Sequence, residues 1–328
     1  MALAEITGHD KQLEILLSAW ARQRLHHAYL FVGAEGVGKR TVALSLARVI
    51  HCSEKSGDFC GQCVNCERIQ DGNHPDVRVI GPLPDKKEIS ILQIREIEKE
   101  LNFRSFSGRK KIAIIDPATL MNLSAQNALL KTLEEPPQDS VLILIASNVG
   151  GLLPTLRSRC LRLSFSPLRR ELLAGFLTAK GMNSETANFL AAISGGSPGV
   201  AVNIDVEDAR ERRQLWSSML SDVKAGSYRA ATEAAEVLAG NKEETAKFLQ
   251  WAETWYRDLL ISRVTQNAGS LVNVDQSAQI EEHAAHGEIE HLLALLAQTS
   301  AASAQIQRNF NRRMVLESLF FAVVGARS

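Results

Sequence analysis

The sequence has no long run of apolar residues. The longest runs, such as residues 141–146, have the length of a β-strand and fall far short of the roughly 20 residues that a membrane-spanning helix needs. The N-terminal residues Met-Ala-Leu-Ala-Glu-Ile also lack a basic stretch followed by an apolar core, which is the pattern of a signal peptide. We therefore expect a protein without a membrane partner that works in the cytoplasm.

An excess of charge of either sign is missing as well. Lys and Arg together number 37, as do Asp and Glu, so the formal net charge is zero. This balance gives no reason to expect a nucleic acid or a membrane surface as the direct partner. One local basic run, formed by Arg104, Arg109, Lys110 and Lys111, is either a surface that faces DNA or a solvated loop, and the solvated loop is the favoured interpretation.

Internal repeats and low-complexity tracts are also absent, and the 328 residues are enough for two or three domains. The first half alternates apolar, strand-like runs with amphipathic helical segments. Strands are predicted at 28–32, 76–80, 111–115, 141–146 and 162–165, and helices at 10–24, 41–50, 89–101 and 124–134. Because several strands are apolar throughout, the pattern predicts an α/β domain whose parallel sheet is covered by helices on both faces.

Strand signals stop near Ser166 and Pro167. Residues 168–206 have the pattern of a few small helices, interrupted at 195–199 by Gly-Gly-Ser-Pro-Gly. From residue 207 to residue 328 the pattern is helical, with a looser loop expected at 267–275. We therefore place domain boundaries near 167 and 207.

A phosphate-binding loop follows the first predicted strand. Gly33, Gly36 and Gly38 precede Lys39 in the order Gly-x4-Gly-Lys, between a strand and a helix, which is the context that this motif requires. The glycines let backbone N–H groups converge on phosphate oxygens, the following helix presents its N-terminus to the same anion, and Lys39 adds a mobile positive charge. The segment predicts a nucleotide-binding site.

Two positions that such a site needs for hydrolysis are altered. The residue after the lysine is ordinarily Ser or Thr, whose hydroxyl holds Mg²⁺, but here it is Arg40, with Thr41 one position late. One residue turns a helix by about 100°, so Thr41 does not simply replace that hydroxyl. Asp116 supplies the acid expected at the end of a neighbouring strand, yet Pro117 follows where a glutamate usually activates water. Asp116 is thus either a metal contact or a cap after the strand, and magnesium binding is in doubt.

Four of the five cysteines crowd into one short segment, whereas Cys160 stands alone. Their order is Cys52-x7-Cys60-x2-Cys63-x2-Cys66, and in a cytosolic protein such crowding indicates a metal site rather than disulfides. Zinc commonly takes four thiolates in a closed tetrahedron, which leaves no open position for water. We therefore expect a structural zinc, with free or redox-active cysteines and an iron–sulfur cluster as the alternatives.

Several segments resemble clamp-loader AAA+ proteins. The most recognisable is 123–137, Leu-Ser-Ala-Gln-Asn-Ala-Leu-Leu-Lys-Thr-Leu-Glu-Glu-Pro-Pro, followed by Leu-Arg-Ser-Arg-Cys at 156–160. Residues 25–31, the tripeptide His-Pro-Asp at 74–76 and, more weakly, residues 309–317 are also similar. With the altered phosphate loop, the chain resembles a subunit of the clamp loader of bacterial DNA polymerase III, and the strong motifs cover about residues 6–165.

This resemblance implies a three-part architecture. A RecA-like AAA+ P-loop domain at 1–167, with the four-cysteine zinc module at 52–66, is followed by a small helical lid at 168–206 and an all-α collar at 207–328. The implied partners are the gamma/tau and delta subunits in a hetero-pentameric ring, the sliding clamp, and primer–template DNA through the assembled complex. Such a ring opens the clamp and loads it onto primed DNA during replication.

The resemblance also assigns roles to three single residues. Arg159 corresponds to an arginine finger that reaches the ATP site of the neighbouring subunit and stabilises the charge on the transferred phosphate. Without the motif it would be an exposed arginine near a strand. Ser147 follows a strand at a sensor position, whereas Gly199 stands where motor subunits carry a nucleotide-sensing arginine. We expect weak or no ATP binding, and no hydrolysis by this chain alone.

Three functional hypotheses follow. The favoured one is a non-hydrolysing subunit that helps to load the clamp and completes a neighbour's catalytic site. The second is an active, gamma/tau-like motor ATPase of the same machine, against which Arg40, Pro117 and Gly199 count. The third is a zinc-containing nucleic-acid-binding module with a vestigial phosphate loop, against which the balanced charge and the lack of aromatic residues among the cysteines count.

Overall fold

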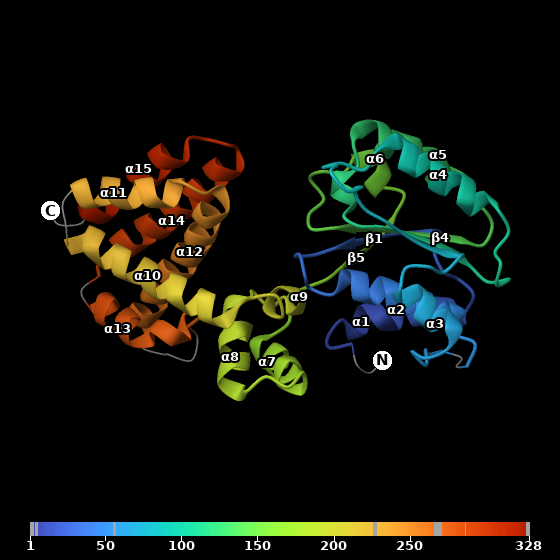
Figure 1. The fold of residues 1–328 in the computed structure, drawn as a ribbon, viewed down its shortest axis with the longest axis horizontal. Helices are drawn as coiled ribbons and strands as arrows, with labels where there is room; N and C mark the ends of the chain where they lie inside the picture. Colours follow the sequence, from blue (N-terminus) through green and yellow to red (C-terminus); the bar gives the residue numbers. More distant parts are fainter. Residues whose placement is uncertain are drawn as a thin grey trace. The chain divides into compact units, whose positions relative to one another are not determined.

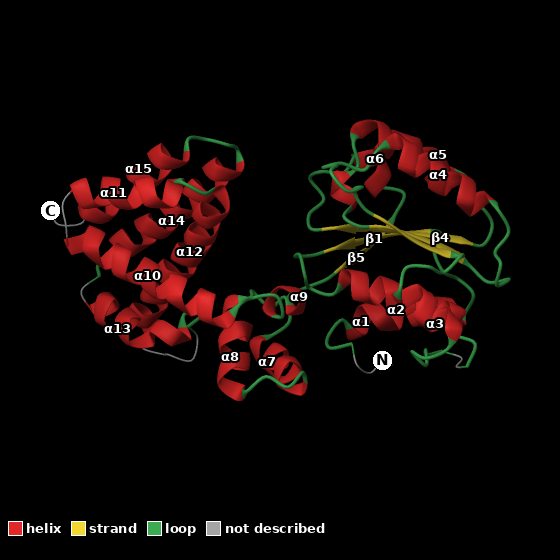
Figure 2. Cartoon of the chain, in the orientation of Figure 1, coloured by secondary structure: helices red, strands yellow, loops and turns green. Residues whose placement is uncertain are grey.

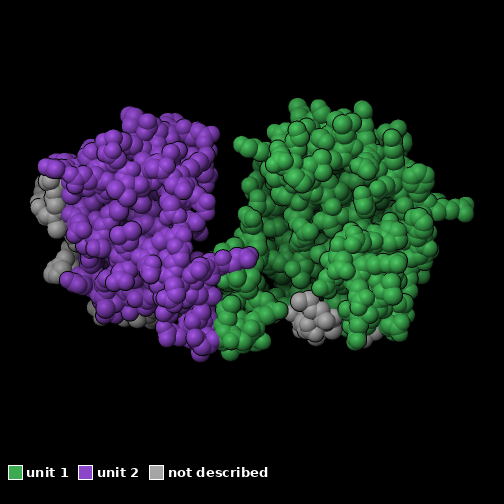
Figure 3. Space-filling model, viewed as in Figure 1, with its two compact units in different colours: residues 1–182, 194–202 green, residues 183–193, 203–328 purple. Residues whose placement is uncertain are grey.

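The computed structural model describes residues 3, 6–54, 57–225, 228–265, 271–285 and 287–325. The chain forms two compact units (Figure 3). The first consists of Met1–Met182 and Ser194–Val202, and the second of Asn183–Ile193 and Asn203–Ser328. The division into three domains at 167 and 207 stays a prediction. In the described part of the chain, no helix is both long enough and apolar enough to cross a membrane.

The first unit is built on a five-stranded sheet (Figure 2). Its strands, in the order β2-β3-β4-β1-β5, are all parallel to their neighbours, so their carboxyl ends meet at one edge. The strands are β1 (Ala28–Val32), β2 (Val77–Ile80), β3 (Lys111–Ile115), β4 (Ser140–Ala146) and β5 (Leu161–Ser164). The α/β fold with a parallel sheet is therefore confirmed, and every predicted strand is present within one residue.

Helices cover both faces of this sheet (Figure 1). One face carries α1 (Asp10–Ala21), α2 (Lys39–His51) and α3 (Val64–Gln70), and the other carries α4 (Ile91–Asn102), α5 (Leu123–Glu134) and α6 (Pro154–Arg157). Alternate side chains of β1 enter two different cores: Leu30 packs in the core of α4 and α5, and Phe31 in the core of α1 and α2. This alternation explains why the strand is apolar throughout.

Local capping fixes where the helices α4 and α5 begin. Ser90 forms a capping box with Gln93, because its side chain accepts the N–H of Gln93 while the Gln93 side chain accepts the N–H of Ser90. Asn122 caps α5 by accepting the N–H of Ala125 at 2.9 Å. Helix α5 ends at Glu134, just before two prolines, as expected.

Short elements complete the first unit, and the second unit is entirely helical. The first unit also holds η2 (Ala118–Leu120), α7 (Arg170–Ala179) and α9 (Pro198–Ala201). The second unit contains α8 (Ser184–Ile193), α10 (Val206–Ala225), α11 (Tyr228–Ala239), α12 (Lys242–Thr265), η4 (Val274–Gln276), α13 (Ser277–Ala285), α14 (Ile289–Gln307) and α15 (Arg312–Val324). Its core is rich in aromatic side chains: Trp216, Phe248, Trp251, Trp255 and Phe320.

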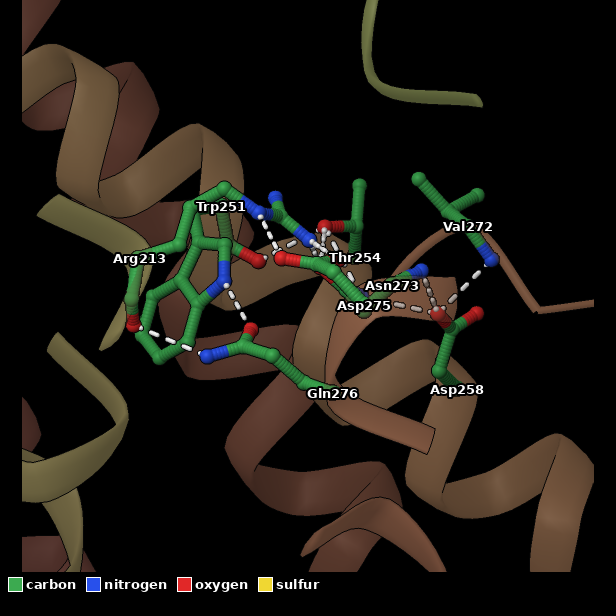
Figure 4. Close-up of polar contacts among 8 residues, drawn as sticks. All are labelled: Arg213, Trp251, Thr254, Asp258, Val272, Asn273, Asp275 and Gln276. Carbon is green, nitrogen blue, oxygen red and sulfur yellow. Dashed lines mark hydrogen bonds and ion pairs between the residues drawn. The ribbon is translucent and has the colours of Figure 1, made fainter. Parts of the chain in front are cut away.

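A buried polar network ties α10 and α12 of the second unit to the segment 271–276 (Figure 4). Arg213 pairs with Asp275 at 2.7 Å and donates to the side chain of Asn273, and the fully buried Asp258 accepts the N–H groups of Val272 and Asn273. Residues 267–270 of the expected looser loop lie outside the described residues. From 271 onward the loop is firmly held, because its polar groups are paired within the interior.

Candidate functional site

The phosphate loop connects β1 to α2 at the carboxyl edge of the sheet. Gly36 and Gly38 have φ angles of 71° and 113°, which other residues seldom adopt, so the loop can turn its amides inward. Within the described residues, the backbone N–H groups of residues 35–38 donate to no acceptor. Lys39 is buried, its Nζ donates to the carbonyls of Gly33 and Ala34 at 2.6 Å each, and burial lowers its pKa. The loop therefore has the conformation of an anion site.

A cavity of about 760 Å³ opens in front of this loop. It brings together the predicted Lys39, Thr41, Asp116 and Ser147 from segments that are far apart in the sequence. The remaining lining residues are Glu35, Gly36, Gly38, Arg40, Pro117, Thr119, Leu120, Ile145, Phe176, Pro198, Gly199 and Val202. The volume falls in the range of small-molecule sites, so the cavity is large enough for a nucleotide.

Arg40 lines this cavity beside Asp116. Its guanidinium lies 3.6 Å from the carboxylate of Asp116, for which the sequence left open a metal contact or a cap after the strand. Burial raises the pKa of Asp116, although the positive charges of Arg40 and Lys39 act in the opposite direction. The positive charge of Arg40 therefore lies beside the acid that would contact a metal ion in a hydrolysing site. The sequence analysis did not predict this pairing of Arg40 with Asp116.

Gly199 packs directly against the phosphate loop. Its N–H donates to the carbonyl of Gly36 at 2.8 Å, and a Cβ atom placed on Gly199 would lie 3.0 Å from both the Cα and the O of Gly36. The space that a side chain at position 199 would enter is thus taken up by the main chain of Gly36. The glycine-rich sequence at 195–199 was a signal for such a close approach, but it did not name the partner.

Arg159 lies outside this cavity, just after α6. Its guanidinium donates to the carbonyl of Thr155 at 2.9 Å and pairs with Glu134, the last residue of α5, at 2.7 Å. The side chain as a whole is 37% exposed. Next to it, burial raises the pKa of Cys160 to about 12, which fits a packed thiol rather than a reactive one.

The four clustered cysteines converge at the other end of α2. Cys52 caps the C-terminus of α2, Cys63 caps the N-terminus of α3, Cys66 lies within α3, and Cys60 lies in the loop between them. Their sulfur atoms all lie within 4.8 Å of one another. Tetrahedral thiolates around zinc would be roughly 3.8 Å apart, so the arrangement fits a zinc ion after small adjustments. All five cysteines are described, and none forms a disulfide.

A second buried group, which the sequence analysis did not recognise, lies beside the cysteine cluster. Asp76 accepts the N–H groups of Phe106 and Ser107 and the hydroxyl of Ser105, and these bonds, despite burial, leave its pKa lowered. His74 accepts the N–H of Asp76 through Nδ1 at 3.1 Å, so the neutral ring carries its proton on Nε2. This cluster holds the loop between α4 and β3, and the His-Pro-Asp tripeptide thus has a structural part to play.

Three side chains of the basic run at 104–111 form hydrogen bonds or ion pairs within the chain. Arg109 donates to the carbonyls of Ile50 and Cys52, and the buried Lys111 donates to the carbonyl of Glu100. Lys110 pairs with the exposed Asp139. The interpretation of this run as a solvated loop is therefore wrong for Lys111, and Arg109 joins the basic run to the segment that carries the cysteines.

Comparison with known proteins agrees with this geometry. The family described as "DNA polymerase III, delta subunit" matches residues 8–169, and "DNA polymerase III, delta subunit, C terminal" matches residues 207–323. DNA polymerase III subunit delta' of Pseudomonas aeruginosa is 31% identical over 303 residues, which cover 89% of this chain and 90% of that protein. The chain belongs to the DNA polymerase III delta' family.

Two further relatives distinguish the delta' subunits from the tau subunit. DNA polymerase III subunit delta' of Escherichia coli is 29% identical over 316 residues, covering 94% of this chain and 92% of that protein. DNA polymerase III subunit tau of the same organism is 33% identical, but only over 169 residues, which cover 51% of this chain and 26% of that protein. The delta' relatives thus match both units, which favours the delta' assignment over the motor hypothesis, and the resemblance to the clamp-loader family is confirmed.

Proposed function

We propose that this chain is the non-hydrolysing delta' subunit of a bacterial clamp loader and that it helps to load the sliding clamp onto primed DNA. One observation carries the absence of hydrolysis, namely that Arg40 lies 3.6 Å from Asp116. Pro117, which stands where a glutamate would activate water, supports it. An arginine has no oxygen with which to hold Mg²⁺, and a proline has no group that takes a proton. The match to delta' relatives over most of the chain supports the same role.

Arg159 acts, in this proposal, on the ATP site of the neighbouring subunit. It does not line the cavity of its own chain, and its side chain is partly exposed. The contacts with Glu134 and Thr155 hold the side chain in one orientation before a neighbour arrives. An arginine held in place stabilises the transferred phosphate at a smaller entropic cost than a freely moving one.

The four clustered cysteines and the phosphate-loop site also have roles in this proposal. We propose that Cys52, Cys60, Cys63 and Cys66 hold one structural zinc ion, because four converging thiols form a closed ligand set. Gly33, Gly36, Gly38, Lys39, Thr41, Asp116 and Ser147 form a nucleotide site that lacks the means for hydrolysis. The free thiols fit a reducing compartment such as the cytoplasm.

The proposed partners are the gamma/tau and delta subunits in a five-membered ring, the sliding clamp, and primer–template DNA through the assembled complex. The all-helical second unit is the candidate for joining the subunits. Helix α15 exposes Met314 and Phe321, and the loop before it exposes Phe310. Exposed apolar side chains near one another in the sequence are candidates for a protein interface.

Two ATPase measurements test the proposal. The purified chain should hydrolyse no more ATP than its Lys39→Ala variant. In the assembled complex, Arg159→Ala should lower hydrolysis at one site by roughly a thousandfold, and the total rate by the share of that site. Arg162→Ala, an exposed arginine on the adjacent strand, is the matched control and should leave the rate unchanged. Activity of the chain alone that is lost with Lys39 would establish a motor instead.

A further inference from the structure

The cavity at the phosphate loop carries two protein cations. Lys39 is buried at its base, and Arg40 extends from the first turn of α2 toward Asp116. The carboxylates of Asp116 and Glu35 lie close enough to influence the charge of Lys39. The two cations and the two carboxylates balance, so the negative charge of Asp116 is neutralised without a metal ion.

The backbone N–H groups of the phosphate loop indicate that its ligand is an anion. The N–H groups of residues 35–38 donate to no acceptor within the described parts of the chain, and three of these residues, Glu35, Gly36 and Gly38, line the cavity just before a 13-residue helix. Four adjacent N–H groups with a helix N-terminus and a buried lysine form a strong phosphate site. The guanidinium of Arg40 adds further donors in a geometry that suits a phosphate.

We propose that this cavity binds a nucleoside diphosphate without a divalent metal ion, with the guanidinium of Arg40 in the place of the metal. The proposal rests on the proposed function in one respect, namely that the site does not hydrolyse its ligand. Arg40 shields the phosphates from Asp116, as a metal ion would. It also repels a divalent cation from the position that it occupies.

The shape of the cavity favours a nucleoside over a bare phosphate. Its volume of about 760 Å³ exceeds the space that a diphosphate needs, and the loop takes up only one part of its lining. Apolar side chains from other segments line the rest, among them Leu120, Ile145, Phe176 and Val202. An apolar wall beside a phosphate loop suits the flat face of a base.

Calorimetric titration of the zinc-loaded chain with ADP tests the proposal, in buffer without added divalent cation and without a chelator. We expect ADP to bind under these conditions and millimolar MgCl₂ to weaken binding at least tenfold. In Arg40→Ser, which supplies the ordinary hydroxyl, the order should reverse: binding without metal weakens at least tenfold, and MgCl₂ restores it. Lys39→Ala should bind weakly under both conditions.

Three outcomes would overturn the proposal. The first is no ADP binding by the unaltered chain, and the second is tighter binding with MgCl₂ than without it. The third is pyrophosphate binding as tightly as ADP, because the apolar wall would then contribute nothing; adenosine alone should not bind measurably. These results are independent of the Arg159 experiment, which measures hydrolysis at the site of a neighbouring subunit. Metal-free ADP binding and the proposed role of Arg159 can therefore be disproved separately.

Discussion

Helix α2 joins two sites that differ in completeness. At its N-terminus the phosphate loop keeps Lys39 and its glycines, but Arg40 replaces the usual Ser or Thr and pairs with Asp116. At its C-terminus Cys52 belongs to a set of four converging thiols with no member missing. The cysteines all come from one short segment, whereas the nucleotide site draws on residues from several separate segments. A distributed site can lose one chemical step while its packing survives, but a four-ligand zinc site cannot lose a ligand so easily.

Loss of the proposed zinc ion should have the largest effect. In Cys63→Ser the proposed ligand set is incomplete, so the loop between α2 and α3 would no longer be held by the ion, and we expect a loss of more than about 4 kcal/mol in the free energy of unfolding. Cys160→Ser, which changes a cysteine outside the cluster, should keep its zinc. Zinc content and urea unfolding measure both changes. Equal zinc content in the two variants would show that the cluster is not a metal site.

Loss of the Asp76 carboxylate, beside the cysteine cluster, should have the next largest effect on stability. Asp76→Ala removes the acceptor for two backbone N–H groups and a hydroxyl, so the loop at 105–107 should detach at a cost of about 3 kcal/mol. Asp139→Ala breaks only the exposed ion pair with Lys110 and should cost less than about 1 kcal/mol. Urea unfolding of the two variants, side by side, gives the difference. Similar costs would mean that the buried bonds contribute little.

The stability of the protein should depend on pH through His51, the last residue of α2. Burial and the neighbouring His74 lower the pKa of His51 to about 4, from an ordinary value of 6.5. The unfolded chain therefore takes up a proton first as the pH falls, and stability decreases between about pH 6.5 and 4, by at most about 1.4 kcal/mol per pH unit for this group. In His51→Gln, with zinc present throughout, the decrease should be shallower. An unchanged slope would exclude His51 as its source.

The phosphate end should show the smallest change in stability. Lys39→Ala removes a buried cation whose lowered pKa indicates that burial disfavours its charge. We expect the free energy of unfolding to change by no more than about 1 kcal/mol in either direction. The matched change at the other end is Cys63→Ser. If Lys39→Ala lowered the free energy of unfolding as much as Cys63→Ser does, the phosphate loop would also be needed for the stability of the fold.

The sequence predicted what depends on neighbouring residues. The apolar strand at 111–115, the phosphate loop and the spacing of the four cysteines are local patterns, and the structure contains each of them. The capping box of Ser90 and Gln93 is a local pattern of the same kind. Local patterns are reliable because a few adjacent residues decide them.

Contacts between distant segments were not predicted. The pairing of Arg40 with Asp116, of Gly199 with Gly36 and of Arg159 with Glu134 each joins residues that only the tertiary fold brings together. Single-sequence patterns carry no register between such segments. The firm hold on residues 271–276 was missed for the same reason, since its acceptor Asp258 lies on another helix.

The backbone contact between Gly36 and Gly199 has a consequence for attempts to repair the site. Serine at position 40 is an ordinary side-chain exchange, whereas a Cβ atom at position 199 would lie 3.0 Å from the main chain of Gly36. A side chain there therefore requires the main chain at Gly36 to shift by a few tenths of an ångström. Position 199 and the phosphate loop are coupled through main-chain contact, so an exchange at position 199 acts on the loop as well.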